Sequence, residues 1–292
     1  MKFGYILPNY GDKVTAQELL EISAVCEEEG FDSVWATDHV IMPRELREPY
    51  GQLLEPLTTL SFIAARCDRL KVGTSILVLP QRNPILVAKQ AAALDVLSKG
   101  RLILGLGAGW VEKEFGFLKA DFRRRGRAMD EEIRLMKALW KDDVVDFEGE
   151  LFQVRDALFL PKPVNGDIPV WIGGNGPPSI RRATKLGDGW HPVGPDLGDF
   201  AAGAAKIREG GRSVTLSVRM VTDVRKKREA HAGPNDEKRV AVSGSAGEIR
   251  KQIEGYAEAG LEYYCAAMNH PAAAEIVSDL RKFSSDVIRS YA

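Results

Sequence analysis

The chain has 292 residues, of which 45% are hydrophobic and 28% are charged. This is the composition of an ordinary globular protein, and a chain of this length can bury a large core. The formal net charge is −1. The chain therefore lacks the overall basic character that would indicate a nucleic-acid partner. No apolar run approaches the roughly 20 residues of a membrane-spanning helix, and the first residues lack the pattern of a secretory signal. From the lack of such a run we expect no membrane partner. Three widely spaced cysteines favour a reducing, cytoplasmic setting.

The first 110 residues alternate between apolar strands and amphipathic helices. Short apolar runs predict strands over residues 2–7, 33–36, 72–79 and 102–106. Helix-start signals stand between them: a capping box that begins at Thr15, Pro56 in a first turn, and the pair Asn83-Pro84. A regular strand–helix repeat predicts a parallel sheet with right-handed crossovers.

The repeat is interrupted and then resumes. In the segment 112–162 we expect one helix over 130–140 and a hairpin around Glu148-Gly149, which together form an insertion. Further strands are predicted over residues 168–173, 189–193, 214–220 and 261–267, with helices over 177–187, 196–210, 245–260 and 271–289. The charged segment Thr222–Arg239 is expected to be an exposed excursion.

A strand–helix repeat of this kind can form either an open doubly wound sheet or a closed barrel. The number of repeats, eight strands and eight helices, favours a (β/α)8 TIM barrel. We expect a single domain of residues 1–292, with the insertion between strands 4 and 5.

The stretch Arg101–Trp110, RLILGLGAGW, combines a buried strand with glycines at positions 105, 107 and 109. Glycines at the carboxyl end of a strand let a ligand approach the backbone closely, although they can also serve packing alone. Ligands of α/β proteins bind at this end of the strands. We therefore expect this stretch to contact a ligand.

Asp38-His39 is an acid–imidazole pair that follows the second strand. A carboxylate can orient an imidazole for proton transfer. In the alternative, Asp38 caps a turn and His39 is a surface residue. The other strand ends carry further polar side chains, at Asn9, Ser75, His191 and Asn269-His270.

The turn Gly173–Gly176 leads into a helix that begins with Pro177-Pro178. Backbone N–H groups at a helix start favour an anion, so this turn indicates a phosphate cradle, with a tight strand–helix turn as the alternative. The glycines do not fit the G-x-G-x-x-G dinucleotide pattern. The four histidines lack metal-ligand spacing, and no G-x-S-x-G elbow is present.

Four stretches resemble the luciferase-like monooxygenase superfamily, especially its branch that uses the deazaflavin coenzyme F-420. They span residues 3–194 and read FGYILPNYG, GFDSVWATDHV, VGTSILVLPQRNPILVAKQAAALDVLSKGRLILGLGAGW and PVWIGGNGPPSIRRATKLGDGWHPVG. The resemblance implies a barrel with an insertion before the fifth strand. It also implies a flavin-type cofactor at the carboxyl-end mouth, either coenzyme F-420 or, as the alternative, FMN.

The resemblance also implies roles for individual residues. The pair matching Ser75-Ile76 often carries a non-prolyl cis peptide, which pushes a side chain against the cofactor ring. His39 matches an acid or base, and Asp38 a residue that contacts the ring, so both are expected to be catalytic. The implied cofactor-binding residues are Asp38, Ser75, Ile76, Val78, Ala108, Gly109, Lys113, Asn175 and Gly176.

From the resemblance we expect an oxidoreductase that moves a hydride between coenzyme F-420 and a small organic substrate. Lys113 and the basic run Arg123–Arg127 could meet the anionic oligoglutamate tail of this cofactor. Trp110 replaces a glutamate that is catalytic in sugar-phosphate dehydrogenases of the branch, which argues against such a substrate. Trp110 and Trp190 suggest an apolar or aromatic pocket instead.

Three other interpretations stay open. They are an FMN-dependent monooxygenase that inserts oxygen, a non-catalytic flavin-binding homologue, and a metal-dependent barrel hydrolase. The histidine spacing opposes the last, and we expect no metal. Because barrels of this family commonly pair, we also expect a homodimer.

Overall fold

The computed structural model describes residues 1–11, 15–232, 237–268 and 272–291. Eight parallel strands pair in succession around a ring, and the last pairs with the first, so the barrel is closed. They are β1 (Lys2–Ile6), β2 (Ser33–Ala36), β3 (Lys71–Thr74), β5 (Leu102–Gly107), β8 (Val170–Gly173), β9 (Gly189–His191), β10 (Thr215–Asp223) and β14 (Tyr263–Ala267). The two-residue strand β4 (Leu77–Val78) follows β3 and also pairs with β5. The predicted TIM barrel is confirmed.

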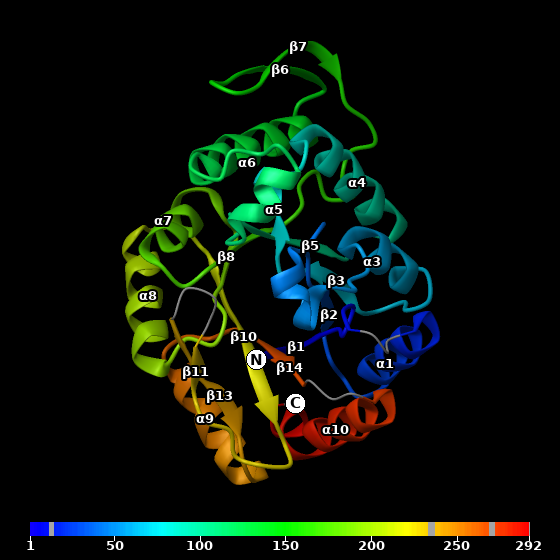
Figure 1. The fold of residues 1–292 in the computed structure, drawn as a ribbon, viewed down its shortest axis with the longest axis vertical. Helices are drawn as coiled ribbons and strands as arrows, with labels where there is room; N and C mark the ends of the chain where they lie inside the picture. The colour runs from blue at the N-terminus through cyan, green and yellow to red at the C-terminus, as the bar shows by residue number, and fades with distance from the viewer. Residues whose placement is uncertain (12–14, 233–236, 269–271, 292) are drawn as a thin grey trace.

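A ring of helices surrounds these strands (Figure 1). They are α1 (Ala16–Glu28), α3 (Pro56–Ala64), α4 (Pro84–Leu97), α6 (Arg125–Lys141), α7 (Pro177–Leu186), α8 (Leu197–Glu209), α9 (Ala246–Glu258) and α10 (Ala273–Asp286). The helix starts follow the local signals. Both capping boxes form, at Thr15 with Glu18 and at Ser245 with Glu248.

Large aromatic side chains fill the inside of the barrel. Trp35, Trp171 and Tyr263 are buried there, and the two tryptophan rings stack with centroids 5.0 Å apart. Gly73 and Gly189 make room for them, because a Cβ atom at either position would collide with an indole ring. The centre is therefore packed with side chains, and only the strand ends are available to a ligand.

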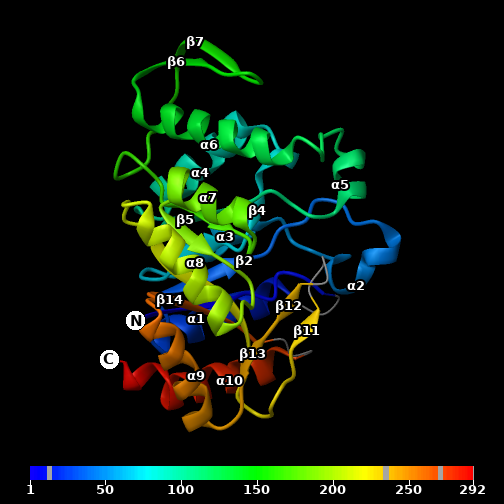
Figure 2. The ribbon, with the colours of Figure 1, turned by 90° about the vertical axis from the view of Figure 1, so that its left-hand side faces the viewer.

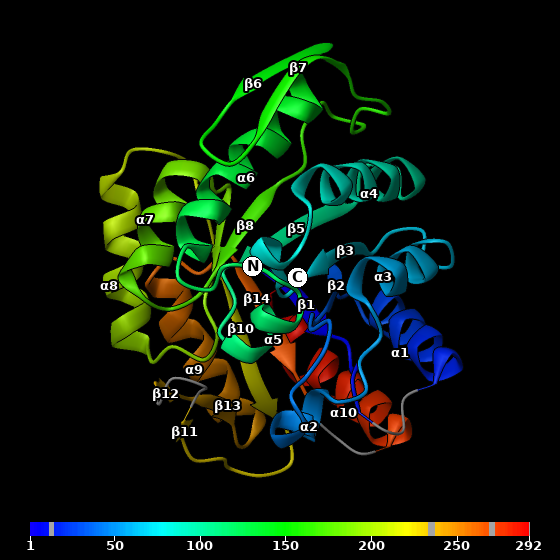
Figure 3. The same cartoon turned by 45° about the horizontal axis from the view of Figure 1, so that its top comes forward.

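The insertion differs from the prediction in two respects. A short helix, α5 (Glu112–Phe117), precedes α6, and α6 begins at Arg125 rather than at Asp130. Since α6 lies in the ring between α4 and α7 (Figure 1), only α5 and the hairpin of β6 (Val144–Glu148) and β7 (Gln153–Leu158) stand outside the repeat. The hairpin projects beyond α6, as Figure 3 shows.

The segment predicted as an exposed excursion is partly ordered into the sheet. Strand β10 continues to Asp223, and β13 (Ala241–Ser243) pairs with it in parallel. Between them, β11 (His231–Ala232) and β12 (Lys238–Arg239) form a small antiparallel pair.

The carboxyl ends of the barrel strands face one side of the molecule. Figure 2 shows α5, β11, β12 and the helix α2 (Arg47–Tyr50) gathered on that side, opposite the chain termini. The connections there also include the 3-10 turns η1 (Arg44–Leu46) and η2 (Leu79–Gln81), whereas η3 (Ile288–Ser290) follows α10. Among the described residues, no helix is both long and apolar enough to span a bilayer.

Candidate active site

Ile76 lies across the strand ends at the barrel mouth. The peptide bond between Ser75 and Ile76 is cis, as the resemblance implied. The Ile76 side chain occupies space left by two glycines on neighbouring strands: a Cβ atom on Gly107 would collide with its Cδ1, and one on Gly173 would lie 2.6 Å from its Cγ2. Ile76 remains partly exposed. Its side chain therefore gives the mouth an apolar surface, which the absence of two Cβ atoms makes possible.

Ser75 is held from inside the barrel. Its carbonyl oxygen accepts a hydrogen bond from Arg219 at 2.7 Å, and its Oγ lies 2.9 Å from His191 Nε2. On its other side, His191 Nδ1 lies 2.8 Å from the hydroxyl of Ser217. Burial and, to a lesser extent, the nearby Arg219 lower the pKa of His191 to about 3, so its ring is neutral. The polar groups of Ser75 and His191 thus hold the turn in place rather than face a ligand.

Asp38 does not orient His39, contrary to one interpretation of the sequence. Its two carboxylate oxygens accept hydrogen bonds from the Val78 N–H at 2.9 Å and from Arg82 at 2.5 Å. Burial raises the pKa of the Asp38 carboxyl, and Arg82 opposes that rise. The side chain has 0% exposed surface. Asp38 therefore ties the end of β2 to the segment after β3, and its carboxylate has no free surface for a cofactor.

Glu114, on α5, is the carboxylate that contacts His39. Its Oε2 lies 3.0 Å from His39 Nδ1, and its Oε1 accepts the N–H groups of Val40 at 2.7 Å and Ile41 at 3.2 Å. Its side chain is 1% exposed. Burial raises the pKa of the Glu114 carboxyl, but hydrogen bonds from His39 and its other neighbours outweigh burial and bring the pKa below its ordinary value. A negative carboxylate therefore faces the imidazole.

Aromatic rings surround the imidazole of His39. The Tyr50 ring lies 4.8 Å from it between centroids, and the Trp110 ring stands nearly perpendicular to it with the centroids 5.9 Å apart. Trp190, by contrast, is not near this group. It is buried, stacks on Phe200 and donates its indole N–H to the Gly174 carbonyl at 3.0 Å. The aromatic environment suggested by Trp110 is present, and the similar suggestion for Trp190 is wrong.

The loop Gly173–Gly176 is fixed by its own neighbours. The Asn175 amide exchanges two hydrogen bonds of 2.9 Å with the backbone of Val193, and Ser179 Oγ donates to the carbonyls of Gly174 and Gly176. Because Pro177 and Pro178 have no N–H, the first two helical positions of α7 offer no donors. The backbone amides of residues 174–176 are therefore the donors that this turn can present to an anion.

The loop after β5 approaches the mouth through Ala108 and Gly109. Gly109 has a φ of +80°, and a Cβ atom there would lie 2.6 Å from Val78 and 2.8 Å from Phe115. Its carbonyl accepts a hydrogen bond of 3.1 Å from Arg125. Lys113, in contrast, is exposed and pairs with Glu45. The implied cofactor residues of this loop thus lie at the mouth, whereas the Lys113 ammonium is held by a surface carboxylate.

The structure brings together residues from four strand ends: His39, Ile76, Gly109 and the loop Gly173–Gly176. Sequence reasoning missed Glu114, because nothing in its local pattern distinguishes it from an exposed helical acid. It also missed Arg219, although the alternation of β10 places this residue on the inward face with Ser217. Asn269-His270 lies outside the described residues. In the described part of the chain, no group of three or more His, Cys, Asp or Glu side chains could hold a metal ion.

Comparisons with known proteins agree on one family. Residues 1–233 match the family model described as luciferase-like monooxygenase. Over 193 residues the chain is 33% identical to the F420-dependent glucose-6-phosphate dehydrogenase of Kineococcus radiotolerans, a match that covers 65% of this chain and 56% of that protein. The chain therefore spans little more than half the length of this curated relative.

Two solved structures share the whole fold. One is an F420-dependent secondary alcohol dehydrogenase in complex with an F420-acetone adduct, with a TM-score of 0.82, 20% identity and 98% coverage of both chains. The other is the coenzyme F420 dependent tetrahydromethanopterin reductase of Methanopyrus kandleri, with a TM-score of 0.80, 18% identity and coverage of 100% of this chain and 99% of that chain. At these identities the likeness shows the fold.

Proposed function

Because this chain belongs to the luciferase-like monooxygenase family, we propose that it is an oxidoreductase that uses coenzyme F-420 to move a hydride to or from a small organic substrate. The observation that carries this proposal is the position of Ile76 on Gly107 and Gly173, beside the loop Gly173–Gly176. A partly exposed apolar side chain next to bare backbone amides suits a flat ring joined to a phosphate. The F420-dependent relatives favour the deazaflavin over FMN.

The residues at the mouth fit such a cofactor. Gly176 has an ordinary φ of −83°, and a Cβ atom there would meet only Pro178, at 3.6 Å. The chain itself therefore does not require glycine at this position, whereas close approach of a phosphate to the backbone would. In this proposal the amides of residues 174–176 hold the phosphate, and Ile76, with Val78, Ala108 and Gly109 beside it, supports the ring.

When bound, the deazaflavin would supply two-electron hydride chemistry. The protein would hold and move the accompanying proton. Because the Glu114 carboxylate can only accept, His39 Nδ1 carries the hydrogen between them, and Nε2 is the nitrogen that exchanges a proton with the substrate. Glu114 acts as a positioning residue that fixes this tautomer, and Asp38 positions the segment of Val78. Tyr50 and Trp110 exclude water from the imidazole.

The test is a screen of the protein with coenzyme F-420 and alcohols, ketones, aldehydes and sugar phosphates, followed by deazaflavin absorbance and by an oxygen electrode. We expect absorbance changes with an uncharged substrate and no oxygen uptake, and His39→Asn should abolish them. Oxygen uptake with reduced FMN and an oxygenated product would instead establish the monooxygenase alternative. Tight cofactor binding without turnover of any compound would favour the non-catalytic homologue.

We also propose that the chain forms a homodimer through an apolar face. Leu86 and Leu97 on α4 are 58% and 72% exposed, and Leu158 at the end of β7 and Leu160 just beyond it are 74% and 53% exposed. The two segments lie together, because Lys89 of α4 donates to the Leu160 carbonyl. An exposed apolar patch of this kind marks an interface. Light scattering should give a dimer for the native chain and a monomer for the variant Leu97→Lys/Leu158→Lys.

The proposal also includes a cytoplasmic location and a single domain. The three cysteines are buried and free, which suits a reducing compartment such as the cytoplasm. One barrel, to which residues at both ends of the chain contribute strands, supports function as a single domain.

A further inference from the structure

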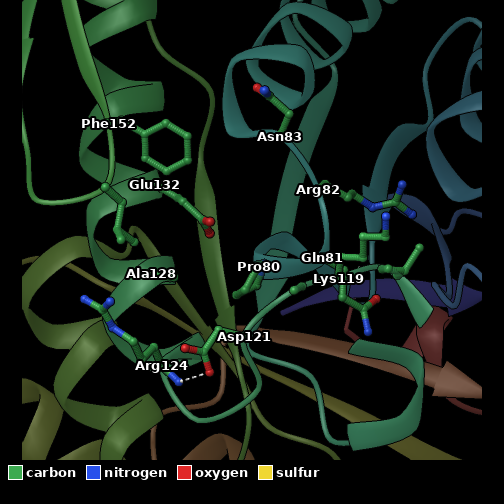
Figure 4. Close-up of a pocket in the computed structure, with 13 residues that line it drawn as sticks. Pro80, Gln81, Arg82, Asn83, Lys119, Asp121, Arg124, Ala128, Glu132 and Phe152 are labelled. Carbon is green, nitrogen blue, oxygen red and sulfur yellow. Dashed lines mark hydrogen bonds between the residues drawn. The ribbon is translucent and has the colours of Figure 1, made fainter. Parts of the chain in front are cut away.

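A pocket lies outside the barrel mouth, between the start of α4, the α5–α6 connection and the tip of the β6–β7 hairpin (Figure 4). Its volume is about 410 Å³. The residues that line it include Pro80, Gln81, Glu132, Lys119 and Arg124, but none of the strand-end residues described above. We call it the outer pocket. The proposed chemistry at the mouth does not use it.

The inner wall of the outer pocket carries polar groups that no other described residue satisfies. Glu132 is 4% exposed, and within the described part of the chain its Oε2 has no hydrogen-bond partner. Gln81 is 9% exposed; its side chain lies against Glu114, but neither its nitrogen nor its oxygen makes a hydrogen bond of normal geometry. In Figure 4 the Glu132 carboxyl extends from α6 toward η2, where Pro80 and Gln81 lie. Because buried polar groups are almost always hydrogen-bonded, these groups indicate a polar occupant.

The chemistry of the pocket selects the kind of occupant. Burial and the neighbouring Glu131 raise the pKa of Glu132 to about 8, so at neutral pH this carboxyl group is a hydrogen-bond donor. Gln81 offers both a donor and an acceptor. At the rim, Lys119 adds an ammonium group, and Arg124 adds a guanidinium group that also pairs with the surface residue Glu150. Asp121 adds a carboxylate there, and Leu151 and Phe152 add apolar surface. An occupant that carries carboxylates beside amide groups would match these donors, acceptors and cations.

The outer pocket adjoins the mouth through consecutive residues. Arg124 lines the pocket, and the next residue, Arg125, donates to the Gly109 carbonyl at the mouth. Arg82 likewise lines the pocket while it holds Asp38. Since neighbouring Cα atoms lie only about 3.8 Å apart, an extended chain that leaves the mouth along residues 124–125 reaches the pocket directly.

We propose that the outer pocket binds a carboxylate-bearing chain with amide links, and that its occupant is the oligoglutamate tail of coenzyme F-420. This assignment rests on the proposed function, which supplies the cofactor. A free γ-glutamyl peptide has the same chemistry, and the experiment separates the two sources. Lys119 and Arg124 bind carboxylates, and Gln81 and Glu132 bind the amide and carboxyl groups that reach the inner wall.

The experiment measures binding rather than turnover. The protein is titrated, by deazaflavin fluorescence, with coenzyme F-420 that carries two glutamates and with the form that has the phosphate but no glutamate. We expect the tailed form to bind about tenfold more tightly. The variant Lys119→Asn/Arg124→Gln should remove this difference without changing the affinity for the tail-free form. Asparagine suits position 119, where φ is +56°.

A matched control has the same loss of charge elsewhere. Lys99 has a φ of +59°, similar to that of Lys119, and Arg155 pairs with Glu148 on the hairpin surface as Arg124 pairs with Glu150, but neither Lys99 nor Arg155 lines the outer pocket. The variant Lys99→Asn/Arg155→Gln should keep the full preference for the tailed form. Equal affinities of both forms for the native protein, or an equal loss in this control, would overturn the assignment. Thermal unfolding of each variant checks that it is folded.

A third arm distinguishes failure of this inference from failure of the proposed function. If neither form of the cofactor binds, the proposed function fails. Calorimetric titration with γ-glutamylglutamate alone then tests the pocket by itself. Binding that is lost in Lys119→Asn/Arg124→Gln supports a site for free carboxylates, and no binding overturns the site.

Discussion

His39 and Glu114 form a buried imidazole–carboxylate pair, with 3.0 Å between His39 Nδ1 and Glu114 Oε2, although 75 residues separate them in the sequence. The pair joins the loop after β2 to α5, and two backbone N–H groups of the same loop bind the other carboxylate oxygen. One glutamate therefore fixes both the orientation of the imidazole and the position of the loop that carries it.

Replacement of this carboxylate should impair proton transfer more than binding. In Glu114→Gln the amide can donate as well as accept, so His39 is no longer restricted to one tautomer. We predict that kcat falls about 100-fold with little change in KM, the size expected for a misoriented acid–base group. Nitrogen NMR of the imidazole should report protonated Nδ1 in the native chain and mixed tautomers in the variant. Unchanged kcat together with an unchanged tautomer would exclude the positioning role.

The same substitution has a defined effect on acid stability. The pKa of Glu114 in the folded chain lies below its ordinary value of 4.5. Its contribution to the free energy of unfolding is therefore present above about pH 4.5 and is lost as the pH falls through the folded-state pKa. The native chain should be more stable than Glu114→Gln at pH 7, and this advantage should shrink in chemical denaturation below pH 4. An advantage that is independent of pH would contradict the assignment.

A substitution at Gly107 tests whether the Ile76 side chain supports the cofactor ring. In Gly107→Ala the new Cβ atom would collide with the Ile76 side chain, so this side chain must move from its present position. Overpacking of this kind costs about 1–3 kcal/mol, and we predict that affinity for coenzyme F-420 falls about tenfold in a fluorescence titration. Gly116→Ala is the control, because a Cβ atom there would have open space. That variant should bind normally, and equal affinities of both variants would remove Ile76 from the site.

Gly176 separates binding of the phosphate from binding of the ring. Gly176→Ala should leave the thermal stability of the cofactor-free protein unchanged, because the new methyl group meets only Pro178 at 3.6 Å. It should lower the affinity for coenzyme F-420 about tenfold, because the methyl group keeps the phosphate away from the backbone. The deazaflavin that lacks phosphate is the control ligand, and its affinity should not change. If both ligands lose affinity equally, the loop does not hold the phosphate.

Glu132 should make the fold less stable as the pH rises. Its pKa is about 8 in the folded chain, against an ordinary value of 4.5. The folded state then holds a proton that the unfolded state has released, so stability falls as the pH rises from about 4.5 through 8. Glu132→Gln keeps the shape of the side chain without its charge. The free energy of unfolding of this variant, relative to that of the native chain, should rise by about 1–3 kcal/mol between pH 5 and pH 9. A constant difference would show that Glu132 does not titrate in this range.

The barrel could be predicted from the sequence because its signals are local. The apolar run Leu102–Leu106 and the cap Asn83-Pro84 each determine the structure of their own segment, and the repeat of such segments determines the closed sheet. The position of Trp190 could have been predicted in the same way. Since Gly189 and His191 face the barrel interior, strand alternation turns Trp190 outward.

The pairing of side chains at the mouth could not be predicted in this way. Sequence adjacency made Asp38 the expected partner of His39, but consecutive residues after a strand turn apart, and Asp38 binds Arg82 instead. The true partner, Glu114, comes from an insertion whose helix is only six residues long. Its position depends on tertiary contacts, such as that of Phe115 with Gly109, that leave no periodic signal.

The central claim is that the apolar support at Ile76 and the bare amides of residues 174–176 together hold coenzyme F-420. The most direct measurement is equilibrium dialysis of the cofactor-free protein against coenzyme F-420 and FMN in parallel. The account predicts saturable one-to-one binding of coenzyme F-420, much tighter than that of FMN and weakened in Gly176→Ala. Tight binding of FMN without binding of coenzyme F-420 would contradict it.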